Sequence, residues 1–197
     1  MNDLERSLAN VGDLSGPAAF AAGRFVDQAA VMVDVAYATM DSPIGVLLLA
    51  ATPEGLIRIG FDHETDVLDD LADRVSPRIL EYPVRLADAQ KELDEYFAGR
   101  RSHFDVPLDW ALIGGFRRRI LEVTARIPFG SLSTYQDVAG QAGQPRGARA
   151  AGQALGGNPI PVIIPCHRVL RSGGGMGGYA GGTDRKEFLL RLEGAML

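Results

Sequence analysis

The most informative stretch of this chain is Asn158-Pro159-Ile160-Pro161-Val162-Ile163-Ile164-Pro165-Cys166-His167-Arg168-Val169. It contains the only cysteine of the 197 residues, and a histidine follows that cysteine directly. A single cysteine cannot form an internal disulfide or a multi-cysteine metal site. Cys166 is therefore either a buried small hydrophobic residue or a nucleophile. The adjacent imidazole of His167, a potential general base, favours the nucleophile.

The composition is typical of a globular protein, with 46% hydrophobic and 23% charged residues. No apolar run approaches the roughly 20 residues that a membrane span requires. The acidic start, Met1–Arg6, lacks the basic and then apolar pattern of a secretory signal. A single cysteine also suits a reducing compartment. We therefore expect a cytoplasmic protein with no membrane partner.

The net charge of −5 is distributed unevenly along the chain. Residues 1–114 hold 9 Lys and Arg against 20 Asp and Glu, whereas residues 115–197 hold 11 against 5. A basic half joined to an acidic half indicates that the basic half meets a polyanion such as nucleic acid. The alternative, that both halves are simply solvated, stays open on charge alone.

The first half of the chain has the pattern of a small α/β domain. Residues 1–34 form an extension, in which short helices are expected but no chemistry. Three strands and then two helices are expected at residues 35–40, 46–51, 55–61, 66–75 and 87–98. This domain is expected to end near Pro107, and no residue in it suggests a functional site.

The second half is dominated by helical patterns. Residues 115–127 place apolar side chains in steps of three and four. Thr134 and Asp137 resemble a capping box, with Asp in place of the usual Glu, at the start of a short helix. Pro145 suits the first position of a second helix, over residues 145–155. Two short helices across a glycine-containing turn indicate a helix-turn-helix, although many helical pairs share this spacing.

The second of these helices has an unusual composition. Most of its side chains are small, so its backbone could approach a partner closely. Arg146, Arg149 and Gln153 share one face by their spacing of three and four, and arginines there would reach phosphates or the base stack. The alternative is a tightly packed internal helix. Asn158 follows and is suited to bonding backbone groups in the turn that leads to Cys166.

The imidazole of His167 needs help to act on the thiol. In an extended segment the side chains of Cys166 and His167 point to opposite faces, so a bridging water or a local bend is required. An acid should orient the imidazole. Glu193 lies four residues after Leu189, at the edge of the apolar face of a last helix that Thr183 can cap. The alternative for Glu193 is a solvated side chain.

The segment 173–182 contains seven glycines and one aromatic residue, Tyr179. It is either a flexible loop or a loop that brings backbone N–H groups and an aromatic ring close to a ligand.

Taken together, these residues resemble the O6-alkylguanine-DNA alkyltransferases, also called methylated-DNA–protein-cysteine methyltransferases. The resemblance covers about Val35 to Glu193. It rests on the pentapeptide Pro165–Val169 after an Asn-Pro pair and a β-branched run, on the turn Asp41–Gly45, and on Ile127–Gly130.

The resemblance implies a fold and an activity. The expected fold is an α/β N-terminal domain over residues 35–107, with a small ribonuclease H-like sheet and helices. A mostly α domain with a winged helix-turn-helix follows over residues 108–197. The implied activity is DNA repair by direct reversal of damage. One alkyl group passes from O6-alkylguanine, and by the same chemistry from O4-alkylthymine, to a protein cysteine that is not regenerated.

The family pattern also implies residue roles for the chemistry. Cys166 would be the alkyl acceptor. His167, through a water, and Glu193 would form the relay that makes the thiolate. Tyr135 would donate a proton or a hydrogen bond to guanine N3 as the leaving group gains charge. No metal and no other cofactor is expected.

Further roles concern the DNA and the base. Arg149 would enter the duplex where the damaged nucleotide is flipped out, with the helix in the minor groove, and Asn158 would brace the turn before the cysteine. Tyr179 and the N–H of Ala180 would line the base pocket. The carbonyls of Val169 and of the acceptor cysteine would accept from the exocyclic amine of the base.

The expected partner is double-stranded DNA that contains O6-alkylguanine. The protein is expected to be a monomer in solution, and cooperative binding along DNA is left open. Three other functions remain as alternatives: a lesion-binding protein without transfer activity, which would lack the acceptor cysteine, a Cys–His hydrolase, and a helix-turn-helix regulator. Only the transferase predicts an alkylated protein.

Overall fold

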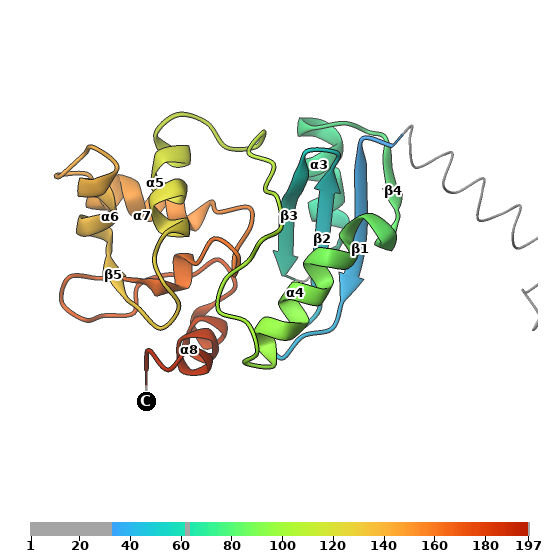
Figure 1. Ribbon diagram of the computed structural model, residues 1–197. Coiled ribbons are helices and arrows are strands. Elements are labelled where there is room, and N and C mark those ends of the chain that lie inside the picture. The colour runs from blue at the N-terminus through green and yellow to red at the C-terminus, as the bar shows by residue number, and fades with distance from the viewer. Residues whose placement is uncertain (1–32, 62–63, 197) are drawn as a thin grey trace, which may run out of the picture. The chain divides into compact units, whose positions relative to one another are not determined.

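The computed structural model describes residues 33–61 and 64–196 (Figure 1). Residues 34–197 form one compact unit, which is described below. The helices expected within residues 1–34 lie outside the described residues. The elements in chain order are β1 Val35–Met40, β2 Leu47–Thr52, β3 Gly55–Phe61, α3 Glu64–Arg74, β4 Ile79–Glu81, α4 Ala87–Phe97, α5 Gly115–Ala125, β5 Ser133–Thr134, α6 Tyr135–Gln141, α7 Ala148–Gly156, β6 Val169–Leu170 and α8 Thr183–Leu192.

The first half folds into a four-stranded sheet with the strand order β3-β2-β1-β4. β1 and β2 pair antiparallel, as do β2 and β3, so the hairpin and the third strand expected from the sequence are confirmed. The hairpin turn closes with Gly45 at a φ of 101°, where its N–H donates to the carbonyl of Ser42 at 3.0 Å. β4 pairs parallel to β1 and was not predicted, because it is only three residues long.

Helices cover both faces of this sheet, which is why all six residues of β2 are buried. Leu48 and Ala50 face Val67 and Leu71 of α3. Leu47 and Leu49 face the other way, into a cluster that contains residues of α4 and of the second half of the chain. Both halves of the chain contribute to this second cluster. Its buried members include Leu93, Tyr96, Ile120, Leu121, Ile164, Cys166 and Leu189. The cysteine therefore lies at the edge of the main hydrophobic core.

The second half is helical, as expected, with the short parallel pair of β5 and β6 beside the helices. Thr134 caps α6 by accepting a hydrogen bond from the N–H of Asp137 at 3.1 Å, which confirms the capping prediction. The second helix of the pair starts at Ala148, so the prediction of a start at Pro145 is wrong.

The late start of α7 has a local cause. The N–H of Gly147 donates to the carbonyl of Gln144 at 2.8 Å, and the side-chain amide of Gln136 donates to the carbonyl of Pro145. These bonds form a turn before the helix. Arg146 therefore lies in that turn and not on the helix with Arg149, which corrects the expected shared face.

Two further expectations are corrected. Gly182, with a φ of 88°, is the N-cap of α8, and Thr183 is the first helical residue and caps nothing with its side chain. Cys166–Arg168 form a 3-10 turn instead of an extended segment, with the N–H of Arg168 donating to the carbonyl of Pro165 at 3.0 Å. The turn bends the chain at the cysteine and the histidine, but it does not join them by a hydrogen bond, because Nδ1 of His167 has no partner among the described residues.

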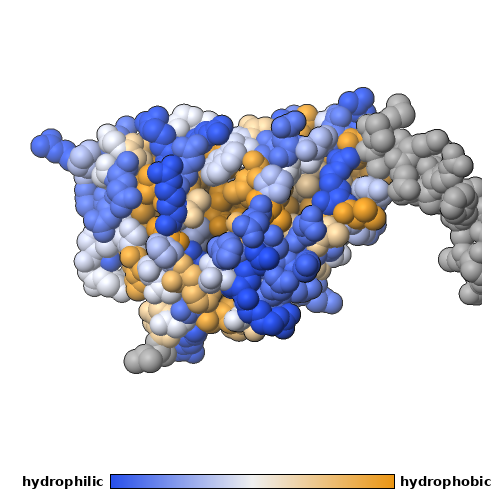
Figure 2. All heavy atoms as spheres, viewed as in Figure 1, coloured by the Kyte–Doolittle hydropathy of each residue, from blue (hydrophilic) through white to orange (hydrophobic). Residues whose placement is uncertain are grey.

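Hydrophilic side chains are spread over the face of the molecule seen in Figure 2, with apolar side chains between them. The large hydrophobic side chains that are exposed are scattered, and they are Val46, Val84, Leu132, Phe188 and Met196. Within the described residues, no helix combines the length and apolar character needed to cross a membrane.

Candidate active site

Asn158 connects the end of α7 to the cysteine. Its side-chain oxygen accepts from the N–H of Ile160 at 3.1 Å. Its side-chain amide donates to the carbonyl of Ile164 at 2.9 Å and lies 3.2 Å from the sulfur of Cys166. All three bonds are buried, so this one side chain fixes the loop that carries the thiol relative to the helix before it.

The same loop contains a strained residue. Val162 has a φ of 74°, the one positive φ among the non-glycine residues that the structure describes. A β-branched residue rarely adopts this conformation, which costs on the order of 1–3 kcal/mol. Val162 is fully buried and the N–H of Ile164 donates back to the carbonyl of Ile160 at 2.9 Å. Tertiary packing thus holds a tight bend four residues before Cys166.

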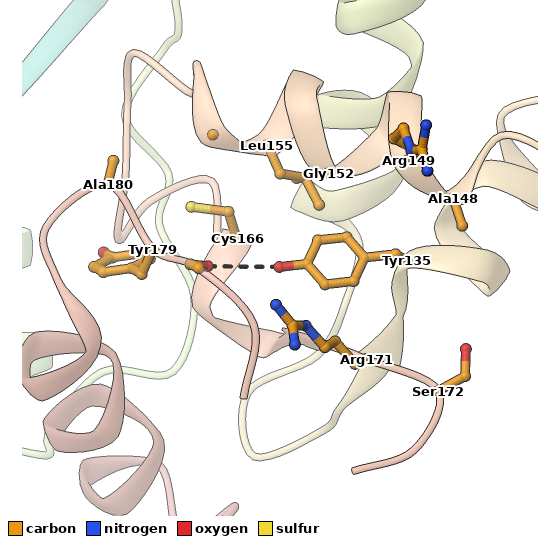
Figure 3. Close-up of a pocket in the computed structure, with 12 residues that line it drawn as sticks. Tyr135, Ala148, Arg149, Gly152, Leu155, Cys166, Arg171, Ser172, Tyr179 and Ala180 are labelled. Carbon is orange, nitrogen blue, oxygen red and sulfur yellow. Dashed lines mark hydrogen bonds between the residues drawn. The ribbon is translucent and has the colours of Figure 1, made fainter. Parts of the chain in front are cut away.

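Cys166 forms part of the wall of a cavity of about 730 Å³. Burial raises the pKa of its thiol to about 11, even though the hydrogen bond from Asn158 acts in the opposite direction. Figure 3 shows the sulfur facing the same space as the rings of Tyr135 and Tyr179. The lining residues are Tyr135, Ala148, Arg149, Gly152, Leu155, Gly156, Cys166, Arg171, Ser172, Gly178, Tyr179 and Ala180. The thiol is therefore nearly buried and faces this cavity.

His167 and Glu193 form a buried pair. His167 Nε2 lies 2.8 Å from Glu193 Oε1, and neither side chain is exposed. Because a carboxylate accepts, Nε2 carries the proton and Nδ1 is the basic nitrogen of the neutral ring. Nδ1 is buried and has no hydrogen-bond partner among the described residues. Burial lowers the pKa of His167 although Glu193 opposes that shift, so the resting imidazole is neutral at pH 7.

Glu193 accepts several further hydrogen bonds. Arg168 donates from Nε to Oε2 and from Nη2 to Oε1, both at 2.8 Å, and the N–H of Gly130 donates to Oε2 at 3.3 Å. Burial alone would raise the pKa of Glu193, but the bonds from His167 and Arg168 outweigh burial and hold that pKa at about 2. Glu193 is thus a permanent anion that orients the imidazole.

Tyr96 supplies a donor from the other half of the chain. It lies on α4, is fully buried, and donates its hydroxyl proton to Glu193 Oε1 at 2.6 Å. Burial and the negative charge of Glu193 raise the pKa of Tyr96, so the hydroxyl stays a donor. The α/β domain, in which no site was expected, therefore contributes directly to the His167–Glu193 pair.

Tyr135 is the first residue of α6, and its hydroxyl donates to the carbonyl of Gly178 at 3.5 Å (Figure 3). The glycine-rich loop can lie this close only because Gly177 has no side chain. At a φ of 70°, a Cβ on Gly177 would sit 2.6 Å from the Tyr135 hydroxyl oxygen. Burial raises the pKa of Tyr135, which keeps it protonated. The loop is therefore a wall of the cavity that positions a phenol.

The residues expected at the DNA are exposed. Arg149 lies on α7 at the rim of the cavity, and Gln153 follows one turn later on the same helix. Arg146 is exposed in the turn before α7 and does not line the cavity. Arg149 is thus the one of the three that lines the same cavity as Cys166.

Only some of the residues expected around the base line the cavity. Tyr179 and Ala180 line the cavity, and the hydroxyl of Tyr179 is buried without a partner among the described residues. Val169 is fully buried but does not line the cavity, and its carbonyl accepts from Nζ of Lys186 at 2.7 Å. Lys186 is fully buried, and burial lowers its pKa to about 8 while the nearby Cys166 opposes that shift.

Sequence reasoning missed four residues of this site, which are Tyr96, Arg168, Arg171 and Lys186. One signal was available for Lys186, because it precedes Leu189 and Glu193 by three and seven residues and so shares their buried helix face. Among residues 33–61 and 64–196, no group of three or more His, Cys, Asp and Glu could hold a metal ion.

The chain is similar to known proteins over most of its length. Residues 115–195 match the DNA-binding domain and residues 35–110 the ribonuclease-like domain of the 6-O-methylguanine DNA methyltransferase models. A methylated-DNA–protein-cysteine methyltransferase of Mycolicibacterium paratuberculosis is 40% identical over 160 residues, which span 81% of this chain and 92% of the relative. The constitutive enzyme of that name from Bacillus subtilis is 35% identical over 158 residues, 80% of this chain and 94% of the relative.

Solved structures agree. The crystal structure of Mycobacterium tuberculosis OGT in complex with DNA matches with a TM-score of 0.70 and 39% identity, over 80% of this chain and 92% of that one.

Proposed function

Since this chain belongs to the 6-O-methylguanine DNA methyltransferase family, we propose that Cys166 is the residue that accepts the alkyl group. The function of the chain is DNA repair by methyl transfer from DNA to a cysteine of the protein. The observation that carries the assignment is the position of Cys166, the one cysteine of the sequence, in the wall of a cavity beside a buried His–Glu pair.

The proposed reaction is a single displacement. The sulfur of Cys166 forms a bond to the carbon of the O-alkyl group, the carbon–oxygen bond breaks, and its electron pair goes to the guanine oxygen. A thiolate is the competent nucleophile, so the resting thiol, with its pKa of about 11, must lose its proton first. The thioether product is stable, and each molecule therefore acts once.

His167 is the proposed acceptor of the thiol proton. Nδ1 is the nitrogen that remains after Nε2 has bonded Glu193, and we assign the transfer to Nδ1 through one water. The imidazolium that forms is stabilised by the carboxylate beside it. Arg168 and Tyr96 also donate hydrogen bonds to that carboxylate, so they hold Glu193 in place and stabilise its negative charge. Their role is to position the acid.

Tyr135 is the proposed donor to guanine N3. Its hydroxyl bonds a carbonyl of the glycine-rich loop only weakly, at 3.5 Å, so a base in the cavity can displace that bond. The raised pKa of Tyr135 favours donation of a hydrogen bond over loss of the proton in the resting state. Tyr179, the N–H of Ala180 and the carbonyl of Cys166 are proposed to contact the remaining edges of the base. The contact expected from the carbonyl of Val169 is not part of the proposal, because Val169 does not line the cavity and its carbonyl accepts from Lys186.

The proposed partner is double-stranded DNA containing O6-alkylguanine, with O4-alkylthymine as a second substrate. The base must leave the duplex to reach a thiol inside a cavity, at a cost of a few kcal/mol. Arg149 is proposed to fill the space that it leaves, from a helix in the minor groove, while Arg146 and Gln153 contact the backbone. Asn158 holds that helix relative to the thiol.

The compartment, the oligomeric state and the domain bounds are also part of the proposal. The protein acts in the cytoplasm as a monomer, and residues 35–107 and 108–197 are its α/β domain and its helix-turn-helix and acceptor domain. Analytical ultracentrifugation of the protein alone and on long duplex DNA tests the monomer and decides whether binding along DNA is cooperative.

Intact-mass measurement after incubation with a duplex containing O6-methylguanine tests the acceptor. We expect one added methyl group per molecule, located by peptide mapping on the peptide of Cys166. Cys166→Ala should bind the duplex and gain no mass. Methylation of that variant would remove the cysteine from the mechanism, and a wild-type protein that binds without gaining mass would leave a lesion-binding function instead.

A further inference from the structure

A second arginine, besides Arg149, lines the cavity. Arg171 follows β6 directly, and Figure 3 shows its side chain reaching below the ring of Tyr135, on the side away from α7. Arg149 lies on α7, at the other end of the Tyr135 ring in the same view. Neither guanidinium has a hydrogen bond or ion pair to any residue that the structure describes, and both side chains are exposed.

The backbone of Arg171 is fixed. Its N–H donates to the carbonyl of Gly175 at 2.9 Å, and its carbonyl accepts from the N–H of Gly174 at 2.9 Å. The preceding residue, Leu170, pairs with Thr134 in the small parallel sheet, and Thr134 precedes Tyr135. The guanidinium is therefore attached to a rigid turn beside the phenol. Because the backbone is already ordered, only the side chain of Arg171 has to lose freedom when it binds a ligand.

The charge of the cavity wall indicates the kind of ligand. The twelve lining residues include two arginines and no acid. An alkylated guanine is neutral, so the base offers these two cations hydrogen-bond acceptors but no negative charge. The phosphodiesters on either side of the nucleotide are anionic and must lie at the rim when the base lies inside. A guanidinium binds a phosphate with two parallel, charge-assisted hydrogen bonds.

We propose that Arg171 binds a phosphodiester that flanks the alkylated nucleotide, on the side of the cavity opposite to α7. This inference rests on the proposed function and assigns a phosphate site to it. The contact requires a phosphate beside the base but no base pair. It differs in this respect from the role of Arg149, which requires a duplex from which the base has left.

Three substrates separate these roles: the free base O6-benzylguanine, a single-stranded oligonucleotide with one O6-methylguanine, and the duplex of that oligonucleotide. Single-turnover rates are measured at subsaturating protein. Arg171→Ala should react normally with the free base and roughly 10- to 100-fold more slowly with both oligonucleotides, the range expected for one lost hydrogen bond to a charged group. Arg171→Lys should recover part of this loss. Arg149→Ala should be slow with the duplex alone.

Arg126→Ala is the matched control, because it removes one exposed arginine of the same half of the chain outside the cavity. It should change all three rates by less than about 3-fold, since one distant surface charge acts weakly at moderate salt. An oligonucleotide with uncharged methylphosphonates on both sides of the lesion supplies the second control. On that substrate, wild type and Arg171→Ala should react at the same rate.

Several results would overturn the phosphate site. Equal slowing of Arg171→Ala on the free base would mean that Arg171 acts on the base or on Tyr135. Slowing on the duplex alone would mean that Arg171 helps to open the duplex. Slowing no greater than that of Arg126→Ala would mean that Arg171 acts only through the overall positive charge of the protein. Normal rates with all three substrates would remove the contact. The proposed function fails separately, if wild-type Cys166 is not alkylated by any of the substrates.

Discussion

Replacement of Glu193 by glutamine is expected to destabilise the fold as well as slow the reaction. The carboxylate accepts hydrogen bonds from His167, Tyr96, Gly130 and twice from Arg168. Glutamine keeps the shape of the side chain but replaces one oxygen by an NH2 group, which cannot accept. It also removes the negative charge opposite the guanidinium of Arg168, which is 5% exposed.

The size of the effect follows from the pKa. Glu193 has a pKa of about 2 in the folded protein, against an ordinary value of 4.5. At about 1.4 kcal/mol per pKa unit, the folded state gains roughly 3 kcal/mol from the ionised carboxylate. Loss of one partner of a buried ion pair typically costs about 3–5 kcal/mol, which agrees. Because the folded pKa is depressed, this stability is fully present above pH 4.5 and is lost as the pH falls toward 2.

Urea denaturation followed by circular dichroism, for wild type and Glu193→Gln, measures this difference. We expect a gap of roughly 3 kcal/mol at pH 7 that falls to less than half of that value at pH 3. Glu187→Gln, on the helix α8 that Glu193 follows, is the control, because the carboxylate of Glu187 forms an exposed pair with Arg191. That variant should lose no more than about 0.5 kcal/mol. A gap for Glu193→Gln no larger than that of the control, or one that does not change with pH, would mean that the ionised carboxylate does not stabilise the fold.

Two further predictions concern single groups of the site. Gly177→Ala should displace the Tyr135 hydroxyl and slow alkyl transfer at least 10-fold in a single-turnover assay. Gly174→Ala is its control, since it has a similar φ of 79° but no atom within 4 Å of its Cβ, and equal rates for the two variants would contradict this. Tyr96→Phe should leave DNA binding unchanged and lower the free energy of unfolding by about 1–3 kcal/mol. It should also slow alkyl transfer, because Glu193 loses a hydrogen bond that holds it in place. An unchanged transfer rate across pH 6–9 would mean that Tyr96 contributes to stability alone.

The elements of the fold were predictable where the signal is local. The β1–β2 hairpin and β3 follow from runs of apolar residues and from turn residues, and Thr134 follows from capping chemistry. The start of α7 was not, because the preference of Pro145 for a first helical turn is weaker than the turn that Gly147 and the side chain of Gln136 form around it.

The site was predictable only in part, for a related reason. Cys166, His167 and Glu193 could be chosen because the chemistry of a nucleophile requires a base and an acid, and a resemblance named them. Tyr96 could not, because its bond to Glu193 joins residues 97 positions apart and depends on how two halves of the core meet. No periodicity in α4 distinguishes this tyrosine from a core residue.

The burial of Cys166 has a consequence for the protein while it waits for damage. In the proposed reaction each molecule uses its one thiol once, so any oxidant or small electrophile that reacts with Cys166 removes a repair event. A thiol with a pKa of about 11 is ionised to less than about one part in a thousand at pH 7. The side chain is also only 5% exposed. The same burial that makes the proposed relay necessary is therefore expected to slow the loss of unused protein to such reactions.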